Sequence, residues 1–344
     1  MLPAKLNVAV IGTGRAGFIH ARNFRSAVSS ARLAAVVEPD PTRRREVLDE
    51  LELETGYAAW EEAISDVRID AVVVAAPTHL HSEIVVAAAE AGKHVLCEKP
   101  LGLHASECRT MLEAVGKHGV VLQLGFMRRY DASFMAARAR LEAGEIGDVV
   151  LVKSLTHGPS VPQPWMYDIA RSNGPLAEVS SHDIDAVRWM TGSEFEEVYA
   201  LAGNFRCPEA RERYPDFYDN VVLTARMTGG RQGLVEGAMA VRYGYDSRME
   251  ILGTRGVLFI GSLKADTVMG FSDRLGASGR IVASWRQLFA AAYLEEDTDF
   301  VRCIREGRPP RAGGIDGLRA VEVVAAGHRS LQTRRPVQLG EAAT

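Results

Sequence analysis

A glycine-rich turn near the N-terminus restricts the fold of this chain more than any other feature. The apolar run 8–11 stops at three spaced glycines, and a helical pattern follows over residues 18–28. The first glycine permits a tight turn, the second lets a pyrophosphate approach the backbone, and the third lets helix and strand pack closely. The N–H groups and dipole at such a helix start attract phosphate. The stretch therefore predicts dinucleotide binding by its whole turn, Gly12, Thr13, Gly14, Arg15, Ala16 and Gly17.

The residue after the next apolar run, 32–37, indicates which dinucleotide binds. Glu38 lies about 20 residues beyond the last glycine, where a carboxylate accepts hydrogen bonds from the adenosine ribose hydroxyls. A carboxylate there also repels a 2′-phosphate, which favours NAD over NADP. Arg43, Arg44 and Arg45 favour NADP instead, because guanidinium groups bind phosphate. A solvated basic helix face explains these arginines as well, so NAD is predicted and NADP is not excluded.

Charge and cysteine content argue against several classes of protein. The chain has 344 residues and a formal net charge of −4, which gives no indication of nucleic-acid or membrane binding. No apolar stretch reaches the roughly 20 residues that a membrane span needs, and no signal-peptide pattern precedes the first strand. The four cysteines lack metal-binding spacing, so no metal site is predicted. We expect a cytoplasmic protein with reduced thiols.

Two further strand ends carry candidate site residues. The unalternating apolar run 69–76 is typical of a parallel strand buried on both faces, and Pro77 and His81 follow it. Dinucleotides bind at the carboxyl ends of such strands. The next strand ends in Glu98, Lys99 and a proline. A lysine at this edge can donate a hydrogen bond to a substrate hydroxyl and favour its deprotonation, although a plain surface lysine has the same spacing.

Four segments together resemble those of the Gfo/Idh/MocA oxidoreductases, and within that family those of the inositol dehydrogenases. They are Gly12-Thr13-Gly14-Arg15-Ala16-Gly17, Ala76-Pro77-Thr78-His79-Leu80-His81, Glu98-Lys99-Pro100 and Gly125-Phe126-Met127-Arg128-Arg129-Tyr130-Asp131. The resemblance covers essentially the whole chain, and the Glu-Lys-Pro tripeptide is its most specific marker. It implies that Pro77, His81 and Glu98 contact NAD and that Lys99 is catalytic.

The sequence pattern changes beyond residue 126. Strands predominate there, and they are expected at 149–154, 195–202, 219–227, 233–243 and 247–252, with helices at 133–143, 284–306 and 317–329. We therefore expect an α/β Rossmann domain over residues 1–126 and an α+β domain over 127–344 with a large, mostly antiparallel open sheet. Imperfect alternation in 220–225 indicates that a second subunit covers the open face. The resemblance implies a homodimer or homotetramer formed through that face.

Residues 174–185 form the chemical centre of the second domain. A proline after a glycine begins a predicted helix, which places Glu178 and His182 four residues apart with Asp185 on the same side. A carboxylate that orients an imidazole is typical of a general base, although an ordinary surface pair has the same spacing. The resemblance implies that His182 is the base. It also implies an aspartate where this chain has Glu178, and this departure concerns the substrate more than the reaction type.

Other residues are expected to recognise the substrate. The resemblance implies contacts from Arg129, His157, Asp185, Tyr243 and Tyr245, although sheet packing or surface charge also explains each of them. The loop that follows residue 157 is rich in proline and longer than is usual in the relatives. A stiff loop of this kind would reshape the pocket.

The patterns predict an NAD-dependent enzyme, and the resemblance implies a dehydrogenase of a cyclic polyol such as myo- or scyllo-inositol. His182 removes the hydroxyl proton, Glu178 holds His182, and Lys99 hydrogen-bonds the oxygen that becomes a ketone, while hydride passes to the nicotinamide. An aminocyclitol or a pyranose sugar is the alternative substrate, if Glu178 meets an amino group. A non-catalytic dinucleotide-binding regulator is a further alternative, but such a protein has no need to keep Lys99 and His182.

Overall fold

The chain forms two compact units in the computed structural model, which describes residues 5–272 and 276–340. The first unit contains the chain up to Tyr130 together with Ala291–Arg319, and the second contains Asp131–Ala290 and the chain from Ala320. The division at 126/127 predicted from the sequence differs mainly in that it leaves Ala291–Arg319 in the second domain. Among the described helices, none combines the length and the apolar character that crossing a membrane requires.

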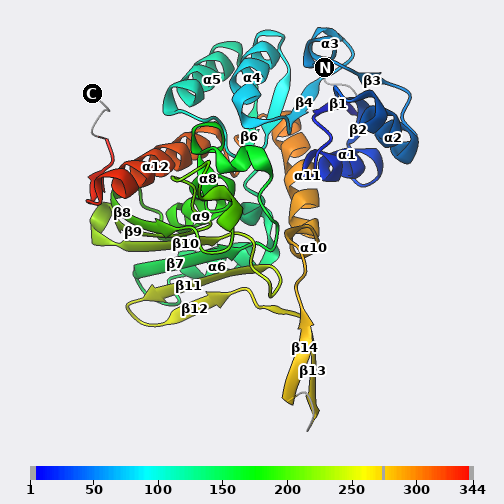
Figure 1. Cartoon of the computed structure of the whole chain (residues 1–344). Coiled ribbons are helices and arrows are strands. Elements are labelled where there is room, and N and C mark those ends of the chain that lie inside the picture. The colour runs from blue at the N-terminus through cyan, green and yellow to red at the C-terminus, as the bar shows by residue number, and fades with distance from the viewer. Residues whose placement is uncertain (1–4, 273–275, 341–344) are drawn as a thin grey trace. The chain divides into compact units, whose positions relative to one another are not determined.

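A six-stranded parallel sheet forms the centre of the first unit (Figure 1). Its order, β3-β2-β1-β4-β5-β6, is that of a dinucleotide-binding fold whose strand order reverses between β1 and β4. The elements are β1 (Leu6–Ile11), α1 (Gly17–Ser26), β2 (Ala31–Val37), α2 (Pro41–Leu51), β3 (Gly56–Tyr57), α3 (Trp60–Ser65), β4 (Ala71–Val74), α4 (His81–Glu90), β5 (His94–Cys97), α5 (Ala105–His118), β6 (Leu122–Leu124) and α11 (Ala290–Glu306). The predicted Rossmann domain is thereby confirmed.

Helix α11 belongs to the first unit because its apolar face completes the core there. Phe300 and Val301 of α11 are fully buried, and they lie in the same apolar cluster as Val8 of β1 and Phe24 of α1. The predicted helix 284–306 is therefore not one element. It is divided into α10 (Trp285–Leu288) and α11, and residues of α11 lie in the apolar core of the first unit.

The glycine turn has the geometry that its sequence predicts. Gly12 has a φ of +89°, a conformation that residues with a side chain rarely adopt. A Cβ added to Gly17 would lie 2.0 Å from the carbonyl oxygen of Gly12, so helix α1 touches the turn without any side chain between them. A Cβ added to Gly14 would meet nothing within 4 Å. Gly14 is thus the one of these three glycines whose missing side chain leaves open space.

A seven-stranded sheet of order β12-β11-β7-β10-β9-β8-β15 forms the second unit. Only β7 and β10 pair in parallel, which confirms the mostly antiparallel sheet. The elements are α6 (Ala132–Glu142), β7 (Val149–His157), α7 (Ile169–Ser172), α8 (Gly174–Glu178), α9 (Ser181–Thr191), β8 (Phe195–Gly203), β9 (Asn220–Met227), β10 (Gln232–Ala238), β11 (Asp246–Gly253), β12 (Val257–Ile260), β15 (Val337–Gln338) and the part of α12 (Gly314–Thr333) from Ala320 onward. Strands β13 (Lys264–Ser272) and β14 (Gly276–Ile281) form a separate two-stranded sheet that extends away from the larger one (Figure 1).

Helices cover one face of the second sheet and leave the other open. Gly233 and Gly237 of β10 approach Val187 and Ser180, so α9 and the residue before it lie on their face. On the opposite face, Leu201 is 60% and Phe259 is 73% exposed. Apolar side chains this exposed fit a face that a second copy covers. The homodimer or homotetramer stays a prediction, which sedimentation velocity would test.

The predicted strand 233–243 is too long, because backbone geometry ends β10 at Ala238. Ala240 has a φ of +56° and Gly244 a φ of +108°, and neither value is compatible with an extended strand. The chain leaves the sheet there and returns as β11 at Asp246. This turn places Tyr243 outside the strands.

Adding a side chain at Gly17 should destabilise the first unit, whereas the same change at Gly14 should not. In Gly17→Ala the new methyl group meets backbone rather than a flexible side chain, so we expect a loss of about 3 kcal/mol in the free energy of unfolding. Denaturant unfolding of Gly17→Ala, Gly14→Ala and the wild type measures both effects. Equal stability of Gly17→Ala and the wild type would contradict the close packing.

Candidate functional site

Glu38 is held in place beside the glycine turn at the end of β2. Its Oε2 accepts hydrogen bonds from Thr13 Oγ1 at 2.6 Å and from Thr13 N at 3.3 Å, and its Oε1 accepts from Asp40 N at 3.2 Å. The carboxylate is therefore fixed beside the glycine turn, and its contact with a ribose stays a prediction. Together with the open space at Gly14, this arrangement fits a dinucleotide.

Two of the three nearby arginines make contacts with the backbone of this region. Arg44 Nη1 donates to the carbonyl oxygen of Glu38 at 2.6 Å, and Arg43 Nη2 donates to that of Thr13 at 3.4 Å. The Arg43 guanidinium also lies over the Phe18 ring, 5.2 Å from its centroid. Arg45 is exposed. Arg43 and Arg44 thus support the turn and the strand end, which is a structural reason for basic residues at this place.

His81 links the ends of β4 and β5. Its Nε2 lies 2.9 Å from the carbonyl oxygen of Ala76, and its Nδ1 lies 2.9 Å from that of Pro100. Burial lowers the pKa of His81, so the ring is neutral at neutral pH and donates to one carbonyl at a time. Its ring therefore holds two loops at the cofactor edge together, whereas Pro77, which follows Ala76, is exposed.

Glu98 is buried and held from three sides. Its Oε2 accepts from the backbone N–H of Lys99 at 3.0 Å, and its Oε1 lies 3.2 Å from His20 Nε2. A Cβ on Gly125 would lie 3.0 Å from the Glu98 carboxyl carbon, so the carboxylate packs against bare backbone. Lys99 follows at the carboxyl edge of the sheet and is partly exposed. The predicted catalytic lysine is therefore anchored through its neighbour.

The sequence interpretation missed a buried polar cluster behind Glu98. His20 Nδ1 lies 2.6 Å from Asp297 Oδ1, and Asn23 Nδ2 donates to Asp297 Oδ2 at 2.8 Å. His20 recurs with Gly17, Ala21 and Phe24 on the buried face of α1, and that spacing was a signal for it. Asp297 gave no such signal, because its helix was assigned to the other domain.

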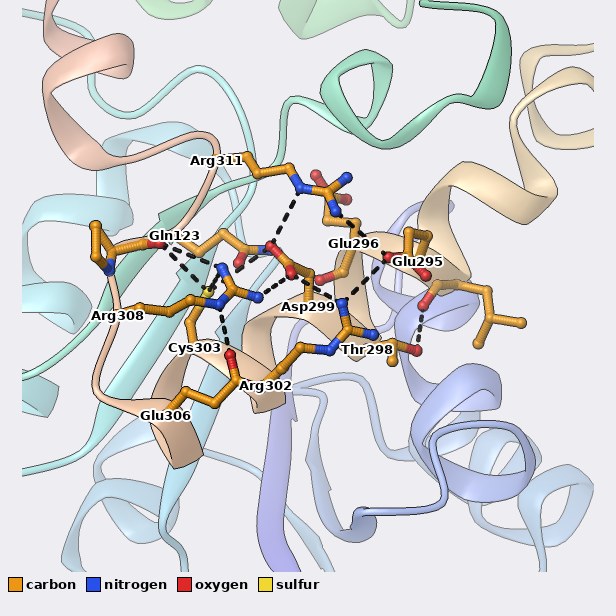
Figure 2. Close-up of polar contacts among 12 residues, drawn as sticks. Gln123, Glu295, Glu296, Thr298, Asp299, Arg302, Cys303, Glu306, Arg308 and Arg311 are labelled. Atoms are coloured by element: carbon orange, nitrogen blue, oxygen red, sulfur yellow. Dashed lines mark hydrogen bonds and ion pairs between the residues drawn. The ribbon is translucent and has the colours of Figure 1, made fainter. Parts of the chain in front are cut away.

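Glu296 is the most unusual member of this cluster. Both of its carboxyl oxygens are buried, and neither has a hydrogen-bond partner among the described residues. Its backbone oxygen accepts from Gln123 Nε2 at 2.9 Å, and Figure 2 shows the two residues side by side. Burial raises the pKa of Glu296 well above its ordinary value of 4.5, so the carboxyl group keeps its proton in the folded chain.

Arg129, a predicted substrate ligand, makes two polar contacts within the first unit. Its Nη2 lies 2.9 Å from Asp316 Oδ1, and its Nη1 donates to the carbonyl oxygen of Arg311 at 2.6 Å. Arg311 itself reaches toward buried Asp299, which also accepts from Arg308 at 2.5 Å (Figure 2). Arg129 is nearly fully buried. These contacts join it to the connection between α11 and α12, and a substrate contact stays a prediction.

The predicted single helix through Glu178, His182 and Asp185 is wrong. Helix α8 ends at Glu178, and α9 begins at Ser181. Between them, Val179 N and Ser180 N both donate to the carbonyl oxygen of Pro175, which closes α8. A Cβ on Gly237 would lie 2.1 Å from Ser180 Oγ, so the junction is pressed onto the sheet. Glu178 and His182 therefore lie on two successive helices and not four residues apart on one face of a single helix.

His182 and Asp185 remain together in the first turns of α9, and both are buried. Asp183, which the sequence interpretation did not single out, accepts a hydrogen bond from Ser154 Oγ at 2.6 Å. Both of these residues are buried as well, and their bond ties α9 to β7. The start of α9 is therefore held to the sheet, while Glu178 belongs to the preceding short helix.

His157 and Tyr243 come together, but they lie away from α9. His157 Nδ1 contacts the Tyr243 hydroxyl, and His157 Nε2 lies 2.9 Å from Glu236 Oε1. Because Ser154 faces α9 and side chains alternate along β7, His157 points to the opposite face by register. Burial, followed by the charge of Asp246, raises the pKa of Tyr243 to about 12.

Tyr245 is buried and packs edge-on against Phe289, with 6.4 Å between the ring centroids.

The described residues contain no group of three or more His, Cys, Asp or Glu side chains placed to hold a metal ion. The predicted substrate residues are thus divided among the α11–α12 connection, the start of α9, the open sheet face and the apolar core.

Replacing the buried Glu296 carboxyl by an amide should change how stability depends on pH. The folded chain keeps a proton that the unfolded chain loses above about pH 4.5, so unfolding free energy falls as pH rises. Glu296→Gln has no carboxyl proton to lose, so this fall is removed. The unfolding free energy of the variant, relative to the wild type, should therefore rise by up to about 1.4 kcal/mol per pH unit. Denaturant unfolding between pH 5 and pH 8 measures the gain.

Thr298→Ala is the control for this experiment, because it alters the same helix without an ionisable group. Thr298 Oγ1 donates only within α11, to the carbonyl oxygen of Leu294 at 2.8 Å. A difference between Glu296→Gln and the wild type that does not change with pH would rule out a retained proton.

Comparison with known proteins agrees with the geometry of both units. The family model described as oxidoreductase family, NAD-binding Rossmann fold, matches residues 6–126, and the Gfo/Idh/MocA C-terminal domain model matches residues 134–259. A myo-inositol 2-dehydrogenase of Thermotoga maritima is 34% identical and aligns over 98% of this chain and 99% of its own length. A scyllo-inositol 2-dehydrogenase (NAD(+)) of Bacillus subtilis is 35% identical, with 97% and 96% covered.

A solved structure supports the same assignment. The scyllo-inositol dehydrogenase of Lactobacillus casei, crystallised with NAD(H) and scyllo-inositol, superimposes with a TM-score of 0.89 at 27% identity and covers 97% of this chain and 99% of that one. The two family models, and the relatives that align over nearly their full length, therefore agree with the structure. Its parallel sheet carries a glycine turn with an acidic residue fixed beside it. On this evidence the chain is a member of the Gfo/Idh/MocA oxidoreductase family with an NAD-binding Rossmann domain.

Proposed function

We propose that this protein oxidises a ring hydroxyl of a cyclic polyol, of the myo- or scyllo-inositol kind, to the ketone with NAD. The observation that carries the proposal is that relatives named inositol 2-dehydrogenases align over nearly the full length of both chains at 34% and 35% identity. The fixed Glu38 carboxylate and the open space at Gly14 support NAD as the cofactor. Bound NAD supplies the acceptor for the hydride that leaves the ring carbon.

The chain's own residues handle the proton and the oxygen in this proposal. His182 takes the hydroxyl proton, because an imidazole is the side chain best suited to this role near neutral pH. The Lys99 ammonium donates a hydrogen bond to the same oxygen and stabilises its negative charge as the carbonyl forms. The anchoring of Lys99 through Glu98 and the attachment of α9 to β7 through Asp183 support both roles.

Glu178 favours a second candidate substrate. It stands where the inositol dehydrogenases usually carry aspartate, and the break after α8 separates it from the helix of His182. For this second candidate we propose that its carboxylate contacts the substrate. An amino-substituted cyclitol would meet this carboxylate with a positive charge, and a pyranose sugar would meet it with hydroxyl groups.

The proposed function predicts NADH formation from myo- or scyllo-inositol and its loss in Lys99→Ala. Removing the ammonium should lower kcat at least about 100-fold, because one donor to a developing oxyanion contributes that much. Initial rates with a panel of inositols, aminocyclitols and free sugars measure the activity, and titration of Lys99→Ala with NAD checks that cofactor binding is kept. Turnover of aminocyclitols or sugars alone would favour the second candidate, and turnover of none would refute both.

Removing the Glu38 carboxylate should shift cofactor preference toward NADP. Glu38→Ala loses the acceptor for the ribose hydroxyls, so the Kd for NAD should rise about tenfold, while the repulsion of a 2′-phosphate disappears. Binding titrations with NAD and NADP measure the ratio of affinities. Glu50→Ala removes an exposed carboxylate from the same region and should leave the ratio unchanged. An unchanged ratio in Glu38→Ala would contradict the ribose contact.

A further inference from the structure

His20 lies between two carboxylates in the interior of the first unit. Its Nε2 is 3.2 Å from Glu98 Oε1 and its Nδ1 is 2.6 Å from Asp297 Oδ1, and the His20 and Asp297 side chains have no exposed surface. A neutral imidazole has a single N–H and can donate to only one of these acceptors. When both carboxyl groups are ionised, only the protonated ring satisfies them together. Burial raises the pKa of Asp297, and the charge of His20 opposes that rise.

The charges around His20 agree with that state. Burial disfavours a charged imidazole, but Asp297 and Glu98 outweigh burial and raise the pKa of His20 well above its ordinary value. The other groups that face the ring are the Glu296 carboxyl, which keeps its proton, and the Tyr293 ring, which lies edge-on at 5.4 Å. Asn23 contacts Asp297 from the same helix as His20.

Glu98 links His20 to Lys99 through its two carboxylate oxygens. One carboxylate oxygen of Glu98 binds His20, and the other accepts the backbone N–H of Lys99. The bare backbone of Gly125 lies against the same carboxyl group and leaves it little room to move. A shift of Glu98 would therefore move the peptide that carries Lys99.

We infer that protonated His20 is a positioning residue, which acts through Glu98 to hold Lys99 where it meets the substrate hydroxyl. This inference rests on the proposed role of Lys99. His20 touches neither NAD nor substrate in this scheme, and Asp297 serves to keep it charged and oriented. The cluster thus connects α11 to a residue at the cofactor edge of the sheet.

The first test compares His20→Asn with Asn23→Ala. Asn23 lies on the same helix and binds the same Asp297, but its side chain does not bridge to Glu98 and has no place in the proposed chemistry. A misplaced catalytic group costs mainly kcat, so His20→Asn should lower kcat about tenfold or more, with the KM for the polyol nearly unchanged. Asn23→Ala should keep the wild-type kcat. Equal losses in both variants, or a wild-type kcat in His20→Asn, would overturn the inference.

Asp297→Asn provides a test that does not depend on the folding of a His20 variant. With one carboxylate removed, His20 should lose its proton at a lower pH than in the wild type. The ratio of variant to wild-type kcat should therefore fall as pH rises from 6 to 9 and recover at low pH. A ratio that stays constant over this range would overturn the inference, because a purely structural loss does not follow the proton.

Lys99→Ala separates this inference from the proposed function. If the wild type turns over no polyol, or if Lys99→Ala is fully active, the proposed role of Lys99 fails and the inference fails with it. If Lys99→Ala is inactive while His20→Asn matches the wild type, the function stands and only the positioning role is refuted.

Discussion

The contact of Gly17 with the backbone of Gly12 sets the geometry of the whole cofactor edge. Because no side chain separates them, α1 begins directly at the turn that ends β1. This closeness brings Thr13 within hydrogen-bond distance of Glu38 on the neighbouring strand. It also brings His20, one helical turn further along α1, to Glu98 at the end of β5. One steric condition thus positions both Glu38 and the anchor of Lys99.

The return of α11 to the first unit supplies the other half of this arrangement. Its apolar residues complete the core, while Glu296, Asp297 and Asp299 bring three fully buried acidic side chains with them. Buried carboxylates are costly unless they are paired, and Asp297 meets His20 while Asp299 meets arginines. Glu296 keeps its proton instead. A helix distant in sequence therefore determines the electrostatics behind the proposed catalytic lysine.

The second unit shows how packing divides residues that are close in the sequence. Glu178 and His182 are four residues apart, but one helix ends and another begins between them, where Ser180 lies close to the bare backbone of Gly237. His157 and Ser154 are three residues apart on one strand and face opposite sides of the sheet. The proposed substrate specificity depends on local features such as this helix break and the direction of each side chain. Membership in a fold does not determine these features.

The sequence alone determined the features that rest on local sterics and periodicity. The glycine turn, the strand that Glu38 follows, the strand that Glu98 and Lys99 follow, and the mostly antiparallel second sheet all follow from the conformational freedom of glycine and from patterns of burial. Tertiary structure decided the membership of α11, the partners of His20, the structural contacts of Arg129 and the break between α8 and α9. These features depend on which segments that are distant in sequence pack together, and on whether a buried charge meets a partner there. The spacing of residues along the chain contains neither piece of information.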